Sequence, residues 1–270
     1  MPDVPTPSPT NPLLSPTMPQ GRNLLSGKVV AISAAAGSGI GFATAQRCVA
    51  EGATVVVSDR HERRLAESAD QLSEQAGAPV LGVPCDVTEQ VSVDAFFDAV
   101  LSEHGVLDVF VNNAGLGGTA NLVDMTDEQW QVVLDVTLNG TFRTNRRALQ
   151  VMQGQGHGVI VNNASVLGWR AQQGQAHYAA AKAGVMALTR CAAVEAAEFG
   201  VRVNAVAPSL AMHANLAKVT SDDLLDQLTS REAYGRAAEP WEIATVIAML
   251  ASDYTTYLTG EVISVSSQRA

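Results

Sequence analysis

Positive charge is scarce in this sequence, which carries 17 lysines and arginines against 27 aspartates and glutamates, a formal net charge of -10 at pH 7. Nucleic acids and anionic membrane surfaces repel a chain of that charge at neutral pH, so neither is expected as a partner. The composition therefore favours a small-molecule partner.

Cysteine is also scarce, and its three positions are Cys48, Cys85 and Cys191. Their odd number and wide spacing exclude a disulfide framework and match no metal-binding or redox motif. We expect reduced thiols, no bound metal and a cytoplasmic location.

Long apolar runs are missing. No stretch approaches the roughly 20 apolar residues that a membrane-spanning helix needs. The N-terminus also lacks the basic-then-apolar order of a secretory signal. We therefore expect no association with membranes.

Proline is rare beyond the beginning of the chain, because seven of the 11 prolines lie within the first nineteen residues. That stretch has almost no periodic apolar pattern. The composition predicts a disordered, proline-rich tail over residues 1–25 and a single domain over residues 26–270.

Short apolar runs then alternate with amphipathic stretches. The runs predict strands at 28–33, 53–58, 79–84, 108–111, 158–161, 201–206 and 260–265. The amphipathic stretches predict helices at 40–51, 62–75, 91–103, 127–152 and 174–199. Short apolar strands separated by helices need both faces covered. We predict an α/β fold with a Rossmann-type, doubly wound, seven-stranded parallel sheet and helices on both faces, in which ligands bind beyond the carboxyl ends of the strands.

A glycine-rich turn follows the first predicted strand and opens the first helix, where backbone amides and the helix dipole can approach a pyrophosphate. Asp59 lies about 20 residues further on, at the end of the second strand, as in dinucleotide-binding units. The residues of this turn are Gly37, Ser38, Gly39, Ile40 and Gly41.

Asp59 predicts NAD rather than NADP, because a carboxylate there accepts hydrogen bonds from the adenosine ribose and repels a 2′-phosphate. Arg60, Arg63 and Arg64 leave the alternative open, since a guanidinium near that ribose can hold a phosphate. Polar groups follow the third and fourth strands at the same edge, at Asp86 and at Asn113, Ala114 and Gly115.

Tyr178 and Lys182 are four residues apart in a predicted helix, so both project from one face. Ser165 lies just past the fifth predicted strand, at the functional edge of the sheet. A tyrosine with an ordinary pKa of about 10 is a poor base at pH 7, and an adjacent ammonium stabilises its anion. Ser165 can donate to a substrate oxygen as an oxyanion-hole donor does. The trio predicts interconversion of a secondary alcohol and a ketone.

With these motifs in their order, the sequence from about Ser26 to Ser266 resembles the classical short-chain dehydrogenase/reductase family. Further markers are Asn204-Ala205-Val206-Ala207-Pro208 and Thr259-Gly260. The resemblance implies a homotetramer built mainly through the two long helices, and a mobile substrate loop over about 209–234. It also implies cofactor contacts from Val87, Pro208, Leu210 and Ala211, besides the residues named above.

The sequence departs from the family pattern in four respects. Ala34 and Ala35 stand where the family usually has threonine and glycine at the start of the cofactor turn, so the turn forms without a permissive residue there. The family's helix asparagine, which completes a catalytic tetrad, is Thr137, and we predict that its hydroxyl supports the proton relay. Ser209 replaces a glycine, and His213 replaces a threonine.

Residues 162–170, together with Ser209 and His213, resemble actinobacterial dehydrogenases of steroid-ring catabolism. This resemblance implies a hydroxylated indane propionate or its thioester as substrate. Apolar walls for a fused ring are predicted at Leu116, Leu167, Trp169 and Met212, and contacts to its acidic or thioester tail at Arg170 and His213.

Two alternatives stay open at this point. A 3-oxoacyl-thioester (ACP or CoA) reductase shares the same motifs. A non-catalytic cofactor-sensing protein could keep the fold without the chemistry, because fold alone does not establish function.

Overall fold

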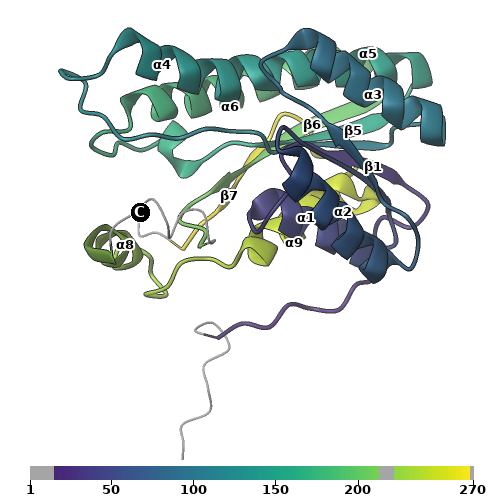
Figure 1. The fold of residues 1–270 in the computed structure, drawn as a ribbon, viewed down its shortest axis with the longest axis horizontal. Coiled ribbons are helices and arrows are strands. Elements are labelled where there is room, and N and C mark those ends of the chain that lie inside the picture. The colour runs from purple at the N-terminus through teal and green to yellow at the C-terminus, as the bar shows by residue number, and fades with distance from the viewer. Residues whose placement is uncertain (1–14, 213–221, 268–270) are drawn as a thin grey trace, which may run out of the picture.

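The computed structural model describes residues 15–212 and 222–267, which fold around one parallel sheet (Figure 1). Its strands pair in the order β3-β2-β1-β4-β5-β6-β7. Their bounds are β1 (Val29–Ile32), β2 (Thr54–Asp59), β3 (Leu81–Pro84), β4 (Val109–Asn112), β5 (Gly158–Asn163), β6 (Val201–Pro208) and β7 (Val262–Val265). The predicted seven-stranded parallel sheet is confirmed.

Helices cover both faces of the sheet (Figure 1). One face carries α1 (Ile40–Ala50), α2 (Glu62–Ala76) and α9 (Pro240–Ala251). The other carries α3 (Gln90–His104), α5 (Gly140–Gln155) and α6 (Ala176–Ala196). Among the described residues, no helix is long and apolar enough to cross a membrane.

The central strand β1 shows why both faces need covering. Val30 and Ile32 are buried with the α1 side, and Val29 and Ala31 with the α3 side. This alternation follows from the two-residue period of a strand. Each large apolar side chain that is fully buried contributes about 1.5–3 kcal/mol.

The helix predicted over 127–152 is interrupted. α4 (Asp127–Leu134) leads into a π-helical turn, η1 (Asp135–Asn139), before α5 begins. Thr137 lies in this turn, fully buried, with its side chain against the loop after β4. The residues predicted as one long helix are helical throughout, but the π turn within them was not predicted, because apolar periodicity does not register a local change in winding.

Two further helices were not predicted, α8 (Asp222–Thr229) and α9. α9 begins with proline at its first turn and a capping box between Glu239 and Glu242. Its residues Ile243, Ile247 and Leu250 are buried at helical spacing.

Packing begins N-terminal to the predicted domain boundary at residue 26. Leu25 is fully buried in the core, and the backbone N–H groups of Arg22 and Leu24 donate to a carboxylate oxygen of Glu51 at 2.7 and 3.1 Å. Arg47 pairs with Glu51 and donates to the carbonyl of Pro19 at 2.7 Å. Backbone bonds to a buried ion pair therefore hold a segment whose composition predicted a tail. The predicted tail's first fourteen residues lie outside the described ones.

Candidate active site

The glycine turn lies between β1 and α1 at the carboxyl edge of the sheet. Ala34 adopts a left-handed conformation, with φ of 50°, and Gly37 also has a positive φ of 94°. The turn thus places an alanine where L-residues are strained. Gly41 has no room for a side chain, because a Cβ would lie 2.4 Å from the carbonyl oxygen of Ala34 and 2.5 Å from Nδ2 of Asn113.

The start of α1 fits a pyrophosphate. Its N-cap is Gly39, whose side-chain position faces open space, as does that of Gly37. No acidic residue lies in its first turn. A helix N-terminus with accessible amides and no competing carboxylate suits an anion.

Asp59 is 8% exposed at the end of β2 and faces this turn. One carboxylate oxygen accepts from the backbone N–H of Ala36 at 3.4 Å, and the other from that of His61 at 2.9 Å. Arg64 lies 3.9 Å from the carboxylate, while Arg60 is exposed. The Asp59 carboxylate is therefore held at the glycine turn.

Ser68 of α2 is a contact that the sequence reasoning missed. Its hydroxyl accepts from the backbone N–H of Gly37 at 3.0 Å, and the residue is buried. The bond fixes the middle of the turn to the second helix. Nothing in the sequence distinguishes this serine from other helix serines.

Asp86 and Val87 follow β3, but both have local partners. Asp86 accepts from the backbone N–H and the hydroxyl of Thr88 at 2.9 and 2.7 Å. Burial acts to raise the pKa of Asp86, but these hydrogen bonds outweigh it and hold the pKa below its usual value. Val87 is buried in the core against Gly140.

A hydrogen-bonded chain joins the glycine turn to Lys182. Asn113 donates from Nδ2 to the carbonyl of Ala34 at 2.9 Å, and its Oδ1 accepts from Nδ2 of Asn163 at 2.8 Å. The carbonyl of Asn163 accepts from the Lys182 ammonium at 2.5 Å. The hydroxyl of Ser33 anchors the near end, accepting from the backbone N–H groups of Asn113 and Ala114. Neither Ser33 nor Asn163 was among the predicted site residues.

Ser165, Tyr178 and Lys182 lie together where β5 meets α6. Burial raises the pKa of Tyr178 to about 12, although a hydrogen bond with Ser165 acts to lower it. The Lys182 ammonium lies 5.6 Å from the centroid of the Tyr178 ring. Burial lowers the pKa of Lys182 to about 8, so at pH 7 this lysine is mostly charged. The trio combines a neutral phenol, a hydroxyl partner and a buried cation.

Thr137 lies beside this trio. Its hydroxyl accepts from the backbone N–H of Leu116 at 3.0 Å and donates to the carbonyl of the same residue at 3.1 Å. A Cβ on Gly115 would lie 3.4 Å from the Lys182 ammonium and 3.9 Å from the Thr137 hydroxyl. The one hydroxyl hydrogen of Thr137 is thus donated to the loop after β4.

The predicted substrate residues lie on separate segments. Leu167 and Trp169 follow Ser165, and the Trp169 side chain is 51% exposed. Arg170 is exposed on the same loop. Met212 donates its backbone N–H to Ala238 at 2.9 Å. His213 and much of the predicted substrate loop lie outside the described residues.

The segment after β6, predicted to reach the cofactor, is held by backbone bonds. Leu210 donates to the carboxylate of Glu232 at 3.4 Å, and Ala211 forms a bridge with Ala238. Pro208 ends β6. The N–H of Ser209 donates to the carbonyl of Val265 at 3.2 Å, and Ser209 does not have a positive φ, so its backbone conformation does not require the glycine that it replaces.

The protein is an oxidoreductase of the short-chain dehydrogenase/reductase family. A family model described as enoyl-(acyl carrier protein) reductase matches residues 34–267. This match confirms the resemblance found in the sequence. Members of the family typically use NAD or NADP.

The chain is 62% identical to (5R,7aS)-5-hydroxy-7a-methyl-1-oxo-2,3,5,6,7,7a-hexahydro-1H-indene-carboxyl-CoA reductase of Mycobacterium tuberculosis, over 92% of this chain and 95% of that protein. It is 39% identical to the 3-oxoacyl-[acyl-carrier-protein] reductase of Thermotoga maritima, over 89% and 97% of the two chains. A short-chain dehydrogenase crystal structure from Mycobacterium smegmatis has 57% identity and a TM-score of 0.85, covering 95% of this chain and all of that one.

Proposed function

We propose that this protein interconverts a secondary alcohol and a ketone on a bulky alicyclic acid derived from a steroid ring, or on its CoA thioester. The grouping of Ser165, Tyr178 and Lys182, joined through Asn163 and Asn113 to the glycine turn, is the observation that carries the proposal. The 62% identity to an indane-carboxyl-CoA reductase supports the substrate class.

Each residue of the trio has a distinct task in this proposal. The phenol of Tyr178 gives a proton to the substrate oxygen during ketone reduction, and the tyrosinate accepts the hydroxyl proton during alcohol oxidation. Ser165 donates a hydrogen bond to the same oxygen as negative charge develops there. The Lys182 ammonium stabilises the tyrosinate, which burial alone disfavours, as the pKa of about 12 indicates. A bound nicotinamide dinucleotide supplies or accepts the hydride.

Thr137 supports this chemistry through the loop after β4. Its two bonds to Leu116 hold that loop beside Lys182, where a relayed proton has to pass. We propose that the predicted relay includes Thr137 and nearby backbone groups, with Thr137 fixing their place.

NAD is the proposed cofactor. Gly37, Ser38, Gly39, Ile40 and Gly41 would hold its pyrophosphate, and Asp59 would accept from the ribose hydroxyls. Asp59 is held at the turn by two backbone N–H groups, and its negative charge would repel the 2′-phosphate of NADP. The remaining predicted cofactor contacts are Arg60, Asp86, Val87, Asn113, Ala114, Gly115, Tyr178, Lys182, Pro208, Leu210 and Ala211.

The substrate pocket is proposed to have apolar walls with a cation at its edge. Leu116, Leu167, Trp169 and Met212 would contact the fused ring. The half-exposed indole of Trp169, four residues after Ser165, offers a large apolar surface. Arg170, on the same loop, and His213 would contact the carboxylate or thioester tail.

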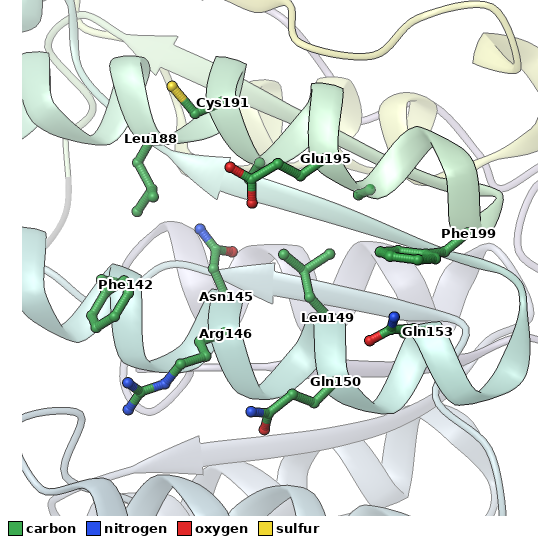
Figure 2. Close-up of a pocket in the computed structure, with 12 residues that line it drawn as sticks. Phe142, Asn145, Arg146, Leu149, Gln150, Gln153, Leu188, Cys191, Glu195 and Phe199 are labelled. Carbon is green, nitrogen blue, oxygen red and sulfur yellow. The ribbon is translucent and has the colours of Figure 1, made fainter.

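A homotetramer is the proposed assembly, with its main contact through α5 and α6. Figure 2 shows a groove between these helices lined by Phe142, Leu149, Leu188 and Phe199. Asn145 is buried there, and neither polar atom of its amide has a partner among the described residues. Phe142 is 46% exposed. An apolar groove with an unpaired amide suits a second copy of the chain, and light scattering that reports a single chain at micromolar concentration would refute the assembly.

All three cysteines are free thiols, which supports the cytoplasm as the proposed location.

A substrate panel tests the proposed function. Purified protein is assayed at 340 nm for reduction of NAD and NADP and for oxidation of NADH and NADPH. The substrates are hydroxylated indane propionates, their CoA thioesters, simple cyclohexanols and 3-oxoacyl thioesters. The expected result is the highest kcat/KM with NAD and the fused-ring substrates.

The 39% identity to a 3-oxoacyl-[acyl-carrier-protein] reductase favours a second candidate function. Linear 3-oxoacyl thioesters reduced with a higher kcat/KM than any fused-ring compound would establish it in place of the first. Absence of turnover on the whole panel would count against both.

A further inference from the structure

The first turn of α6, which carries Tyr178, is tied to the loop after β4. We call residues 113–125 the β4 loop. The backbone N–H of Ala120 donates to the carbonyl of Gly174 at 3.1 Å. The side chain of Gln175 donates from Nε2 to the carbonyl of Gly118 at 2.7 Å and to the hydroxyl of Thr119 at 3.3 Å. The β4 loop and the start of α6 are therefore joined by hydrogen bonds.

His177 directly precedes Tyr178 and is 2% exposed. Its Nδ1 accepts from the backbone N–H of Tyr178 at 2.9 Å. That N–H lies in the first helical turn, where it has no intrahelical partner. The N-cap residue Gln175 makes no capping bond because its side chain reaches the β4 loop instead. The imidazole of His177 thus provides the cap, and the accepting Nδ1 places the ring proton on Nε2.

Three glycines of the β4 loop each lie close to a different side chain of α6. A Cβ on Gly115 would lie 3.4 Å from the Lys182 ammonium, and one on Gly117 would lie 3.9 Å from Cδ2 of Tyr178. A Cβ on Gly118 would lie 3.1 Å from Nε2 of His177. The β4 loop therefore lies directly against the N-terminal half of α6, beside His177, Tyr178 and Lys182.

We propose that His177 and Gln175 are positioning residues that set the place of Tyr178 relative to Ser165 and the substrate oxygen. The inference rests on the proposed role of Tyr178 as the proton-transfer group. Proton transfer requires hydrogen-bond reach, about 2.6–3.2 Å between heavy atoms. A displacement of about 1 Å costs on the order of 10²-fold in rate. Caps and loop bonds at the helix start supply that precision.

Two variants of His177 separate its hydrogen bond from its bulk. His177→Phe keeps a ring but has no acceptor, whereas Asn in His177→Asn places an oxygen where Nδ1 was. We expect His177→Phe to lower kcat by about 10-fold, within the loss that misplacement causes, and to leave the KM for the cofactor unchanged. His177→Asn should restore at least half of the wild-type kcat.

Hydrogen exchange provides a readout besides activity. The backbone N–H of Tyr178 should exchange faster in His177→Phe than in the wild type and in His177→Asn, as measured by mass spectrometry on peptides from the start of α6. Wild-type kcat in His177→Phe, or equal loss in both variants, would overturn the role assigned to His177.

Gln173 and Gln175, just before α6, give a matched pair of variants that tests the role of Gln175. Gln175→Met removes the bonds to Gly118 and Thr119, and Gln173→Met removes only the bond to Asn121 at the outer end of the loop. We expect Gln175→Met to lower kcat several-fold and Gln173→Met to leave it unchanged. Equal kcat in the two variants would overturn the role of Gln175.

Tyr178→Phe is measured in the same assay, so that two failures can be told apart. Retained turnover in Tyr178→Phe refutes the proposed function. Lost turnover in Tyr178→Phe together with normal kcat in His177→Phe and Gln175→Met refutes only the positioning inference.

Discussion

Lys182→Met should make the protein more stable at neutral pH while abolishing its turnover. The native pKa of about 8 lies roughly 2.5 units below the ordinary 10.5. At 1.36 kcal/mol per unit, keeping this buried lysine charged costs about 3 kcal/mol at pH 7. Methionine has no such cost, although it loses the bond to the carbonyl of Asn163, which is worth about 1.5–3 kcal/mol as a charged hydrogen bond. We therefore expect a net gain of about 1 kcal/mol.

The pH dependence makes this prediction sharper. The pKa of Lys182 is lower in the folded state than in the unfolded state. The destabilisation caused by burying its charged ammonium is therefore fully present below pH 8 and disappears as the pH rises from about 8 toward 10.5. Between pH 7 and 9.5, the free energy of unfolding of the wild type should therefore rise by roughly 2 kcal/mol relative to that of Lys182→Met.

Urea unfolding at equal protein concentration, at pH 7 and 9.5, measures both effects. Lys28→Met is the control, because it removes the ammonium of a lysine that pairs with Asp253 at the surface and leaves the buried Lys182 in place. A stability difference between wild type and Lys182→Met that stays constant across this pH range would show that the buried charge does not destabilise the fold.

The remaining predictions concern four other positions. Tyr178→Phe should leave cofactor binding intact and lower turnover by a factor on the order of 10² or more, as steady-state assays and cofactor fluorescence will report. Asp59→Ala should lose affinity for NAD and gain some for NADP through Arg60, and a wild type that prefers NADP would contradict this assignment. Ala34→Gly should raise the free energy of unfolding by up to about 1 kcal/mol, because glycine adopts a positive φ without strain; a lower urea midpoint would speak against it. Thr137→Val should lower turnover about 10-fold whereas Thr137→Ser retains it, and full activity of the valine variant at every pH would move the relay elsewhere.

The parallel sheet could be predicted because its strands are short apolar runs that alternate with amphipathic helices, as in Val29–Ile32 and Ile40–Ala50. The order in which the strands pair was not predicted. Position at the carboxyl edge then indicated Asp59 and Ser165, and the four-residue spacing from Lys182 indicated Tyr178. These predictions depend on periodicity and on topology, which both leave a pattern along the chain.

The missed features depend on contacts between distant backbone groups. Asn163 acts through its carbonyl as well as its amide, and Ser33 acts on two backbone N–H groups, so residue type alone reveals neither role. Leu25 donates its backbone N–H to the backbone carbonyl of Glu51, 26 residues away, and no local pattern indicates the burial of Glu51. The π turn at Thr137 changes the winding without changing the apolar period.

The amide pair between Asn113 and Asn163 limits how the protein can be recombined with its relatives. One member follows β4 and the other ends β5, so an exchange of the N-terminal half for that of another enzyme, with the junction between these strands, separates the two. If the other enzyme has a different residue at the position of Asn113, the amide of Asn163 loses its hydrogen-bond partner. The end of β5, whose carbonyl binds Lys182, is then no longer tied to the loop after β4. Chimeras designed to change the cofactor should therefore have their junction before β4, or should carry both asparagines together.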